Sequence, residues 1–203
     1  MTRSTAAGTA RTAAQVAQRR RALPNGWWGA ALLIATEATL FGTLLASYYY
    51  LRFQSVAWPP AGIAPPDKTA PLILTGVLVA SAAPMFAAAR AAGAGRTRAV
   101  WWLVLAALAA QGAYFGLQMH FFLADLDKLS PKATAYGSIY FTLLGVHHAH
   151  VAVGLLLDVW LLGRLLRGLT NYRVIATRVI ALYWYFVALV GILVVATQLY
   201  PSW

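Results

Sequence analysis

Histidines and an acid within one apolar stretch are the residues whose types and spacing could do chemistry. The segment GVHHAHVAVG contains His147, His148 and His150, and Asp158 follows it. On a helix that advances about 100° per residue, His147 and Asp158 are nearly eclipsed and His150 is one turn along from His147. One helix face is therefore predicted to carry two imidazoles and a carboxylate, whereas His148 points elsewhere.

Glu37 is an acid near the middle of a different apolar stretch. An acid at that depth in a membrane costs on the order of 3 kcal/mol on insertion scales, so it needs a reason to be there. Two interpretations follow from the residues alone. These groups could form a proton relay or metal site, or they could only hydrogen-bond across the bundle to hold helices together.

A metal site can be tested by counting ligands. Membrane di-iron centres need about eight histidines spread over several segments, and this chain has four. A haem between two helices would need His120 and one of the other three, whose depths match poorly. The absence of cysteine excludes disulfides and thiolate ligands. We therefore expect no metal and no cofactor to be bound by this chain.

Five apolar stretches must position these groups. The chain has 203 residues, of which 61% are hydrophobic and 10% are charged, a composition outside the range of soluble domains. Each stretch is long enough to cross a hydrocarbon core of about 30 Å as a helix; their approximate ranges are 27–52, 71–92, 99–120, 136–163 and 174–199. The predicted fold is an all-α integral membrane bundle of five transmembrane helices over residues 27–203.

The distribution of positive charge predicts the topology. Twelve of the sixteen Lys and Arg residues fall on one side. Five lie in residues 1–26, three in the loop region after the second stretch and four in the loop region after the fourth; the other four Lys and Arg residues lie on the other side. The positive-inside rule then places the N-terminus in the cytoplasm and the C-terminus outside. The positive residues behind the net charge of +11 are thus concentrated on one side of the membrane, and they do not indicate nucleic-acid binding. Residues 1–26 are predicted to be a basic disordered or peripheral arm, with a transit peptide as the alternative.

Gln118 and His120 stand at the expected outer end of the third stretch, in FGLQMHFF. Neighbouring aromatic residues suggest an interfacial belt there. We therefore interpret both residues first as interfacial anchors.

Four segments in the correct order resemble motifs of the cytochrome c oxidase subunit III family. They are WWGAALLIATEATLFGTLLASYYY with Glu37, the loop WPPAGI, YFGLQ, and YGSIYFTLLGVHHAHVAVG with its paired histidines. The resemblance covers about residues 27 to 200. It is closest to a short five-helix form that lacks the family's first two helices.

This resemblance implies a non-catalytic subunit of a bacterial haem-copper terminal oxidase, in the inner (plasma) membrane. Haem and copper would lie in the partner subunits I and II, and phospholipid would be bound. By position, Glu37 becomes the buried carboxylate, and His147 and His150 become the paired histidines. Arg164 becomes the candidate for a lipid headgroup, and as an arginine at a helix end it could also snorkel to a phosphate.

Two departures from the family's pattern stand out. The last helix reads YWYFVA, so that Tyr185 and Ala188 replace a histidine and an acid. The acid expected shortly after Leu-Gln is also absent, and His120 looks like a local substitution, whereas Gln118 is expected to hydrogen-bond within the bundle. Asp158 has no assigned family position, which leaves a pairing with Arg164 or with a neighbouring chain.

Three alternatives remain open at this stage. The accessory subunit of nitric oxide reductase has the same five-helix form, and a quinol oxidase differs in its electron donor, which other chains determine. A small proton-coupled transporter would also use a mid-membrane Glu and His. It would be expected to show broken helices or inverted repeats, and only Pro84 interrupts a predicted helix.

Overall fold

Five long helices make up the part of the chain that the structure describes. The computed structural model describes residues 25–63 and 68–199. Its helices, each long and apolar enough to cross a membrane, are α2 (Asn25–Phe53), α3 (Thr69–Gly93), α4 (Thr97–Lys128), α5 (Ala135–Leu165) and α6 (Asn171–Leu199). The prediction of an all-α protein with five spans is confirmed. Most of the predicted basic arm, residues 1–24, lies outside the described residues.

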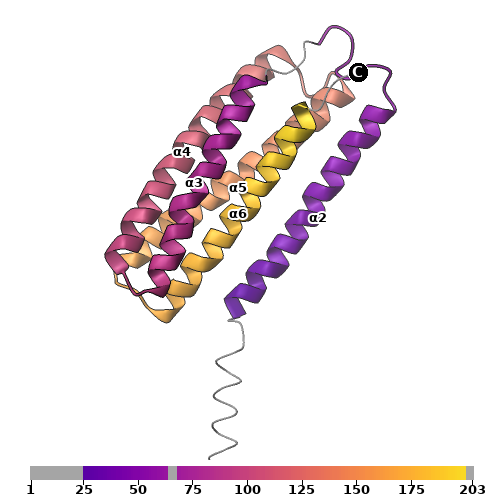
Figure 1. Ribbon diagram of the computed structural model, residues 1–203. Coiled ribbons are helices and arrows are strands. Elements are labelled where there is room, and N and C mark those ends of the chain that lie inside the picture. The colour runs from indigo at the N-terminus through magenta and orange to yellow at the C-terminus, as the bar shows by residue number, and fades with distance from the viewer. Residues whose placement is uncertain (1–24, 64–67, 200–203) are drawn as a thin grey trace, which may run out of the picture.

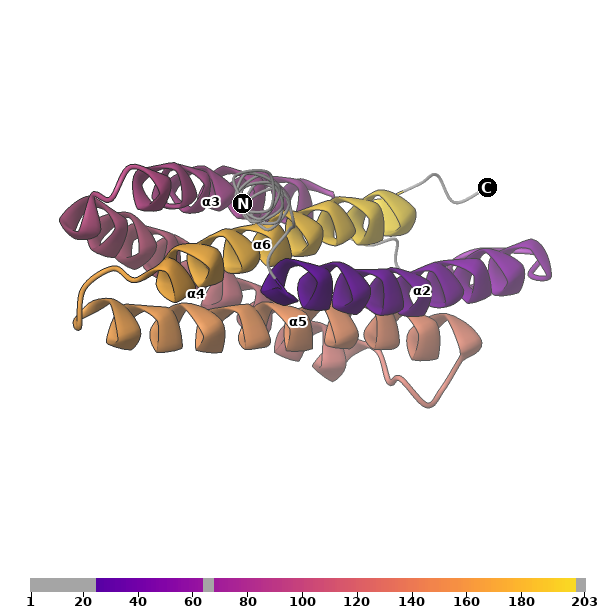
Figure 2. The same ribbon diagram turned by 90° about the horizontal axis from the view of Figure 1, so that it is seen from below.

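Four of the helices close into a ring. Helix α3 contacts α4 and α6, and α5 contacts the same two neighbours. Helix α2 stands beside this ring and contacts only α5 and α6 among the described elements (Figures 1 and 2). In its most apolar stretch 11% of the residues are buried, against 61% for α6. Most of α2 therefore depends on lipid or another chain for cover.

Short connections join consecutive helices of the ring. Gly95 and Gly168, with φ of +71° and +84°, make the turns between α3 and α4 and between α5 and α6, a backbone conformation that glycine adopts without penalty. Helix α5 begins at an N-cap, where Oγ1 of Thr134 accepts a hydrogen bond of 3.0 Å from the Gly137 amide. This cap satisfies one of the free amides at the start of the helix.

The WPPAGI loop folds back onto the end of the bundle where α5 begins. Trp58 is buried, and its indole nitrogen donates to the Tyr48 hydroxyl over 2.9 Å. Its ring also packs edge-on against Tyr136, with centroids 5.0 Å apart. The loop therefore links α2 to α5 at this end.

One predicted boundary was wrong. The third stretch was expected to end at residue 120, but α4 continues to Lys128, whereas the other boundaries agree within three residues. No Gly or Pro interrupts residues 121–128. The apolar residues 121–124 continue the helix, and Asp125, Asp127 and Lys128 end the apolar run without ending the helix. Gln118 and His120 consequently lie two to three turns before the end of α4.

Candidate functional site

Glu37 and His150 form an acid–base pair between α2 and the ring. Oε2 of Glu37 lies 2.9 Å from Nε2 of His150, although the two residues are 113 apart in the chain. Their side chains are 25% and 15% exposed. Glu37 is thus less buried in this chain than the prediction of a buried carboxylate implied.

The hydrogen bonds of His150 define how many protons this pair holds. Its Nδ1 lies 2.8 Å from the Val146 carbonyl oxygen, which can only accept, so Nδ1 carries a hydrogen. Nε2 then either donates to a Glu37 carboxylate or accepts from a protonated one. In both cases a single proton lies between the two side chains.

Aromatic residues shield the pair on the ring side. The Phe41 ring packs edge-on against the His150 ring, with centroids 5.0 Å apart. Phe186 of α6 also packs against Phe41, with its ring centroid 6.3 Å from that of Phe41. The Tyr183 hydroxyl donates to the backbone oxygen of His150 over 2.9 Å. Contacts to α6 therefore hold the His150 segment in position.

His147 faces a different neighbour from His150. Its Nε2 lies 3.3 Å from the Tyr114 hydroxyl of α4, and the ring is 2% exposed. The prediction that His150 shares one face with His147 is wrong, because His147 contacts α4 whereas His150 contacts Glu37 of α2. Because α5 packs against α2, α4 and α6 at once, the roughly 60° between His147 and His150 is enough to direct them at different helices.

Asp158 is fully buried between three helices. Its Oδ2 accepts a hydrogen bond of 3.0 Å from the Trp184 indole nitrogen. With the amide of Gln111 oriented so that its nitrogen faces the carboxyl group, that nitrogen donates to the same oxygen over 2.7 Å. Within this chain Asp158 therefore contacts Trp184 and Gln111, and the pairing with Arg164 that the sequence left open is not formed.

Gly154 makes the Trp184 contact possible. A Cβ atom at this position would lie 2.6 Å from Cζ2 of Trp184. The absence of a side chain lets the indole lie against α5 one turn before Asp158.

His148, Gln118 and His120 also separate in the structure. Nδ1 of His148 lies 2.5 Å from the Leu144 carbonyl oxygen, and its ring packs near Phe122. Gln118 is buried, whereas His120 is exposed on the outside of α4. Gln118 thus belongs to the interior of the ring, and only His120 retains the position of a surface anchor.

Arg164 lies at the last turn of α5 between two aromatic rings. Its guanidinium carbon is 5.6 Å from the centroid of Trp160 and 6.0 Å from that of Tyr172. These distances are typical of cation–π contacts. Its Nε has no hydrogen-bond partner within residues 25–63 and 68–199, so the arginine is positioned but retains donor capacity.

The two departures on α6 have different environments. Tyr185 is 36% exposed and lies beside Phe86 of α3, whereas Ala188 is buried. The position that lost a histidine therefore points away from the centre of the ring.

Several contact residues were missed by sequence reasoning. They are Gln111, Tyr114 and Trp184, together with Asp125, whose Oδ2 accepts a 2.9 Å hydrogen bond from Tyr140. Gln111 and Gln118 are seven apart, so a search for polar residues on one face of a helix would have found both. The tyrosine and tryptophan partners carry no such signal.

The four histidines do not converge on a metal. No group of three or more His, Cys, Asp or Glu side chains within the described ranges could hold an ion. His147, His148 and His150 contact Tyr114, a backbone oxygen and Glu37, respectively. Within the described ranges these three histidines therefore have separate neighbours.

These features define a multi-pass membrane protein with polar contacts between its helices. The family described as "Cytochrome c oxidase subunit III" matches residues 11–202, and the chain belongs to it. It is accordingly a subunit of a terminal oxidase complex.

Bacterial relatives agree with this assignment over most of their length. The chain is 32% identical over 177 residues to the probable cytochrome c oxidase subunit 3 of Nocardia farcinica, covering 83% of this chain and 84% of the relative. It is 29% identical over 173 residues to cytochrome c oxidase subunit 3 of Bacillus subtilis, covering 83% and 81%. It is also 29% identical over 172 residues to the cytochrome bo(3) ubiquinol oxidase subunit 3 of Pseudomonas aeruginosa, covering 83% and 80%.

Proposed function

We propose that this chain is the non-catalytic subunit III of a bacterial haem-copper cytochrome c oxidase. In this role it stabilises subunit I, supports proton uptake and binds phospholipid at Arg164. Haem and copper belong to partner subunits I and II. The chain is oriented with its N-terminus in the cytoplasm and its C-terminus outside, in accordance with its charge distribution.

The Glu37–His150 pair is the observation that supports a role in proton uptake. It holds one proton between an acid and a base at 2.9 Å. The Glu37 side chain remains 25% exposed on a helix that is mostly uncovered. A neighbouring chain that packs against α2, or water held at the surface of that chain, can therefore exchange a proton with this pair without entering the ring.

The dispersal of the histidines supports a non-catalytic role. Each imidazole described above has a separate partner, and no two of them converge on one point. The contacts stabilise the bundle and position α2 against it. Electron transfer is therefore assigned to the partner subunits.

Cytochrome c is the proposed electron donor of the complex. Relatives of similar identity are named as subunits of a cytochrome c oxidase and of a ubiquinol oxidase, so the donor is tested directly. The tagged chain is isolated with its partners, and oxygen uptake is measured with reduced cytochrome c and with ubiquinol. Preference for ubiquinol would contradict the choice of donor and leave the family assignment intact.

Replacement Glu37→Gln tests the role of the pair. The glutamine amide can still donate to Nε2 of His150, so the complex should assemble with an unchanged reduced-minus-oxidised haem spectrum. The variant cannot release the proton, so we expect slower proton uptake, or earlier loss of activity during prolonged turnover.

Thr39→Val is the matched control, because Thr39 lies on α2 and its hydroxyl bonds only to the Ala35 oxygen of its own helix. Both variants are followed by oxygen consumption and by proton uptake in vesicles. If Glu37→Gln retains the turnover, lifetime and proton uptake of Thr39→Val, the pair has no part in proton uptake.

A further inference from the structure

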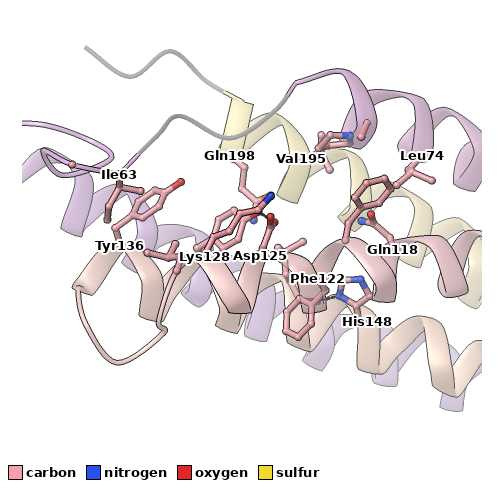
Figure 3. A pocket seen from close by; sticks show the side chains of 17 residues that line it. Ile63, Leu74, Gln118, Phe122, Asp125, Lys128, Tyr136, His148, Val195 and Gln198 are labelled. Carbon is pink, nitrogen blue, oxygen red and sulfur yellow. Dashed lines mark hydrogen bonds between the residues drawn. The ribbon is translucent and has the colours of Figure 1, made fainter.

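A cavity of about 610 Å³ lies inside the ring at the end where α5 begins. It is lined by residues of α3, α4, α5, α6 and the α2–α3 loop. Figure 3 shows Ile63 and Tyr136 at one end of the cavity and Gln118 and His148 at the other. The exposed Lys128 is among the lining residues, so the cavity reaches the surface of the bundle.

The inner end of the cavity is deep within the bundle. His148 follows the first residue of α5 by thirteen positions, a rise of about 20 Å at 1.5 Å per residue. Gln118 precedes the last residue of α4 by ten positions, or about 15 Å. The floor of the cavity therefore lies near the middle of α5.

His148 presents an unpaired nitrogen at this floor. Its ring is 4% exposed, and its Nε2 has no hydrogen-bond partner within the described ranges. Nδ1 faces the Leu144 oxygen, which can only accept, so Nδ1 carries a hydrogen. In a neutral ring Nε2 is then an acceptor. A buried acceptor of this kind requires a donor.

A second unpaired group lies along the wall. Gln198 lines the same cavity, and its side-chain nitrogen is buried and has no partner in the described part of the chain. It can only donate, whereas Nε2 of His148 can only accept in a neutral ring. An occupant of the cavity must therefore both donate and accept hydrogen bonds.

Water is the occupant that fits this lining. An acyl chain would leave both nitrogens unpaired. The charged side chains that line the cavity are one carboxylate, Asp125, and one ammonium, Lys128, so the lining does not select an ion of one sign. The volume has room for on the order of 20 water molecules.

We propose that this cavity is a water-filled vestibule that opens at the end of the bundle bearing the α2–α3 loop and carries water as far as His148. The vestibule is separate from the Glu37–His150 pair, which lies on the α2 side of α5. It gives His148 access to water from one side of the membrane only. This inference goes beyond the proposed function and does not depend on the electron donor.

Single-cysteine labelling tests the vestibule in the intact complex. The chain contains no cysteine, so any maleimide mass shift on it reports the introduced residue alone. Gln198→Cys and Gln118→Cys probe the wall and the floor. Leu117→Cys is the matched control, because this neighbour on α4 is 51% exposed on the outside of the ring and does not line the cavity. Val56→Cys, at a fully exposed residue of the α2–α3 loop, identifies the side on which the vestibule opens.

A small membrane-impermeant maleimide is added separately to right-side-out and inside-out vesicles. We expect Gln198→Cys and then Gln118→Cys to react at least tenfold faster than Leu117→Cys, from the same side as Val56→Cys. Reaction of Gln118→Cys no faster than Leu117→Cys would overturn the proposal. Reaction from the side opposite Val56→Cys would overturn it as well. A reversed orientation of the whole chain would change the reactive side of all positions together, and would contradict only the proposed topology.

Radiolytic footprinting supplies a test on the unmodified complex. Hydroxyl radicals formed from bound water oxidise adjacent side chains. Tyr140 lines the cavity and Tyr114 does not, although both are at most 8% exposed. We expect oxidation of Tyr140 several-fold above that of Tyr114, and equal protection of the two would overturn the proposal even if a cysteine variant fails to assemble.

Discussion

The indole nitrogen of Trp184 donates a 3.0 Å hydrogen bond to Oδ2 of the fully buried Asp158. This contact joins α6 to α5 inside the ring, and Gln111 of α4 donates to the same oxygen. A carboxyl group held by neutral donors from two other helices fixes how the three helices approach one another. Removal of the acceptor oxygens of Asp158 should therefore cost more stability than the loss of a single contact does.

Replacement Asp158→Ala should destabilise the chain by about 1–3 kcal/mol for each donor that is left buried without an acceptor. Asp158→Asn retains an acceptor oxygen at the same place and should cost less. Thermal loss of the chain from the solubilised complex distinguishes the two variants. Equal midpoints for Asp158→Ala and the unmodified chain would show that the contact does not stabilise the ring.

Replacement Gly154→Ala should force Trp184 away from Asp158. The added Cβ would lie 2.6 Å from Cζ2 of the indole, and overpacking of this kind costs about 1–3 kcal/mol. Gly163→Ala is the control on the same helix, since a Cβ there meets nothing within 4 Å. A lower thermal midpoint for Gly154→Ala alone is expected, and equal midpoints would contradict the prediction.

The Glu37–His150 pair should be energetically coupled. Glu37→Leu and His150→Leu each remove the 2.9 Å contact, so the double variant should lose about as much stability as one single variant, with a coupling of about 1 kcal/mol. The cycle is measured by heat-induced loss of the chain from the complex. In the control, the stability losses of Thr39→Val and His150→Leu should add up in the double variant. If the losses of Glu37→Leu and His150→Leu also add up, the coupling is refuted.

Replacement Arg164→Gln should release on the order of one phospholipid per complex, because it removes the charge that pairs with a phosphate. Arg164→Lys keeps the charge but loses the planar group between Trp160 and Tyr172, and an intermediate loss is expected. Arg167→Gln, an exposed arginine at the same end of α5, is the control. Lipid is counted by mass spectrometry of the isolated complex, and identical counts for Arg164→Gln and Arg167→Gln would argue against a headgroup site.

The spans could be predicted from sequence because apolar length alone determines which segments cross a membrane. The end of α4 could not, because the apolar residues 121–124 are followed by Asp125, Asp127 and Lys128, which end the apolar run and still form helix. Hydropathy marks where a helix enters or leaves the apolar layer, and it does not mark where the backbone hydrogen bonds stop.

The partners of the candidate residues were beyond sequence reasoning for a different reason. Helical spacing correctly placed His147 and Asp158 on a similar face of α5, but it cannot say which helix packs against each residue. Glu37 meets His150 across 113 residues of chain, and Asp158 meets a tryptophan because Gly154 removes a side chain. Such contacts depend on the order of helices around the ring.

The place of α2 beside the ring has a consequence for how the protein is made. Helix α2 is the first of the described helices to leave the ribosome, yet its contacts are with α5 and α6, the last two. Glu37 therefore enters the bilayer more than a hundred residues before His150 has been synthesised. Until then the nascent chain must keep an acid in the membrane without its partner, at a cost of about 3 kcal/mol.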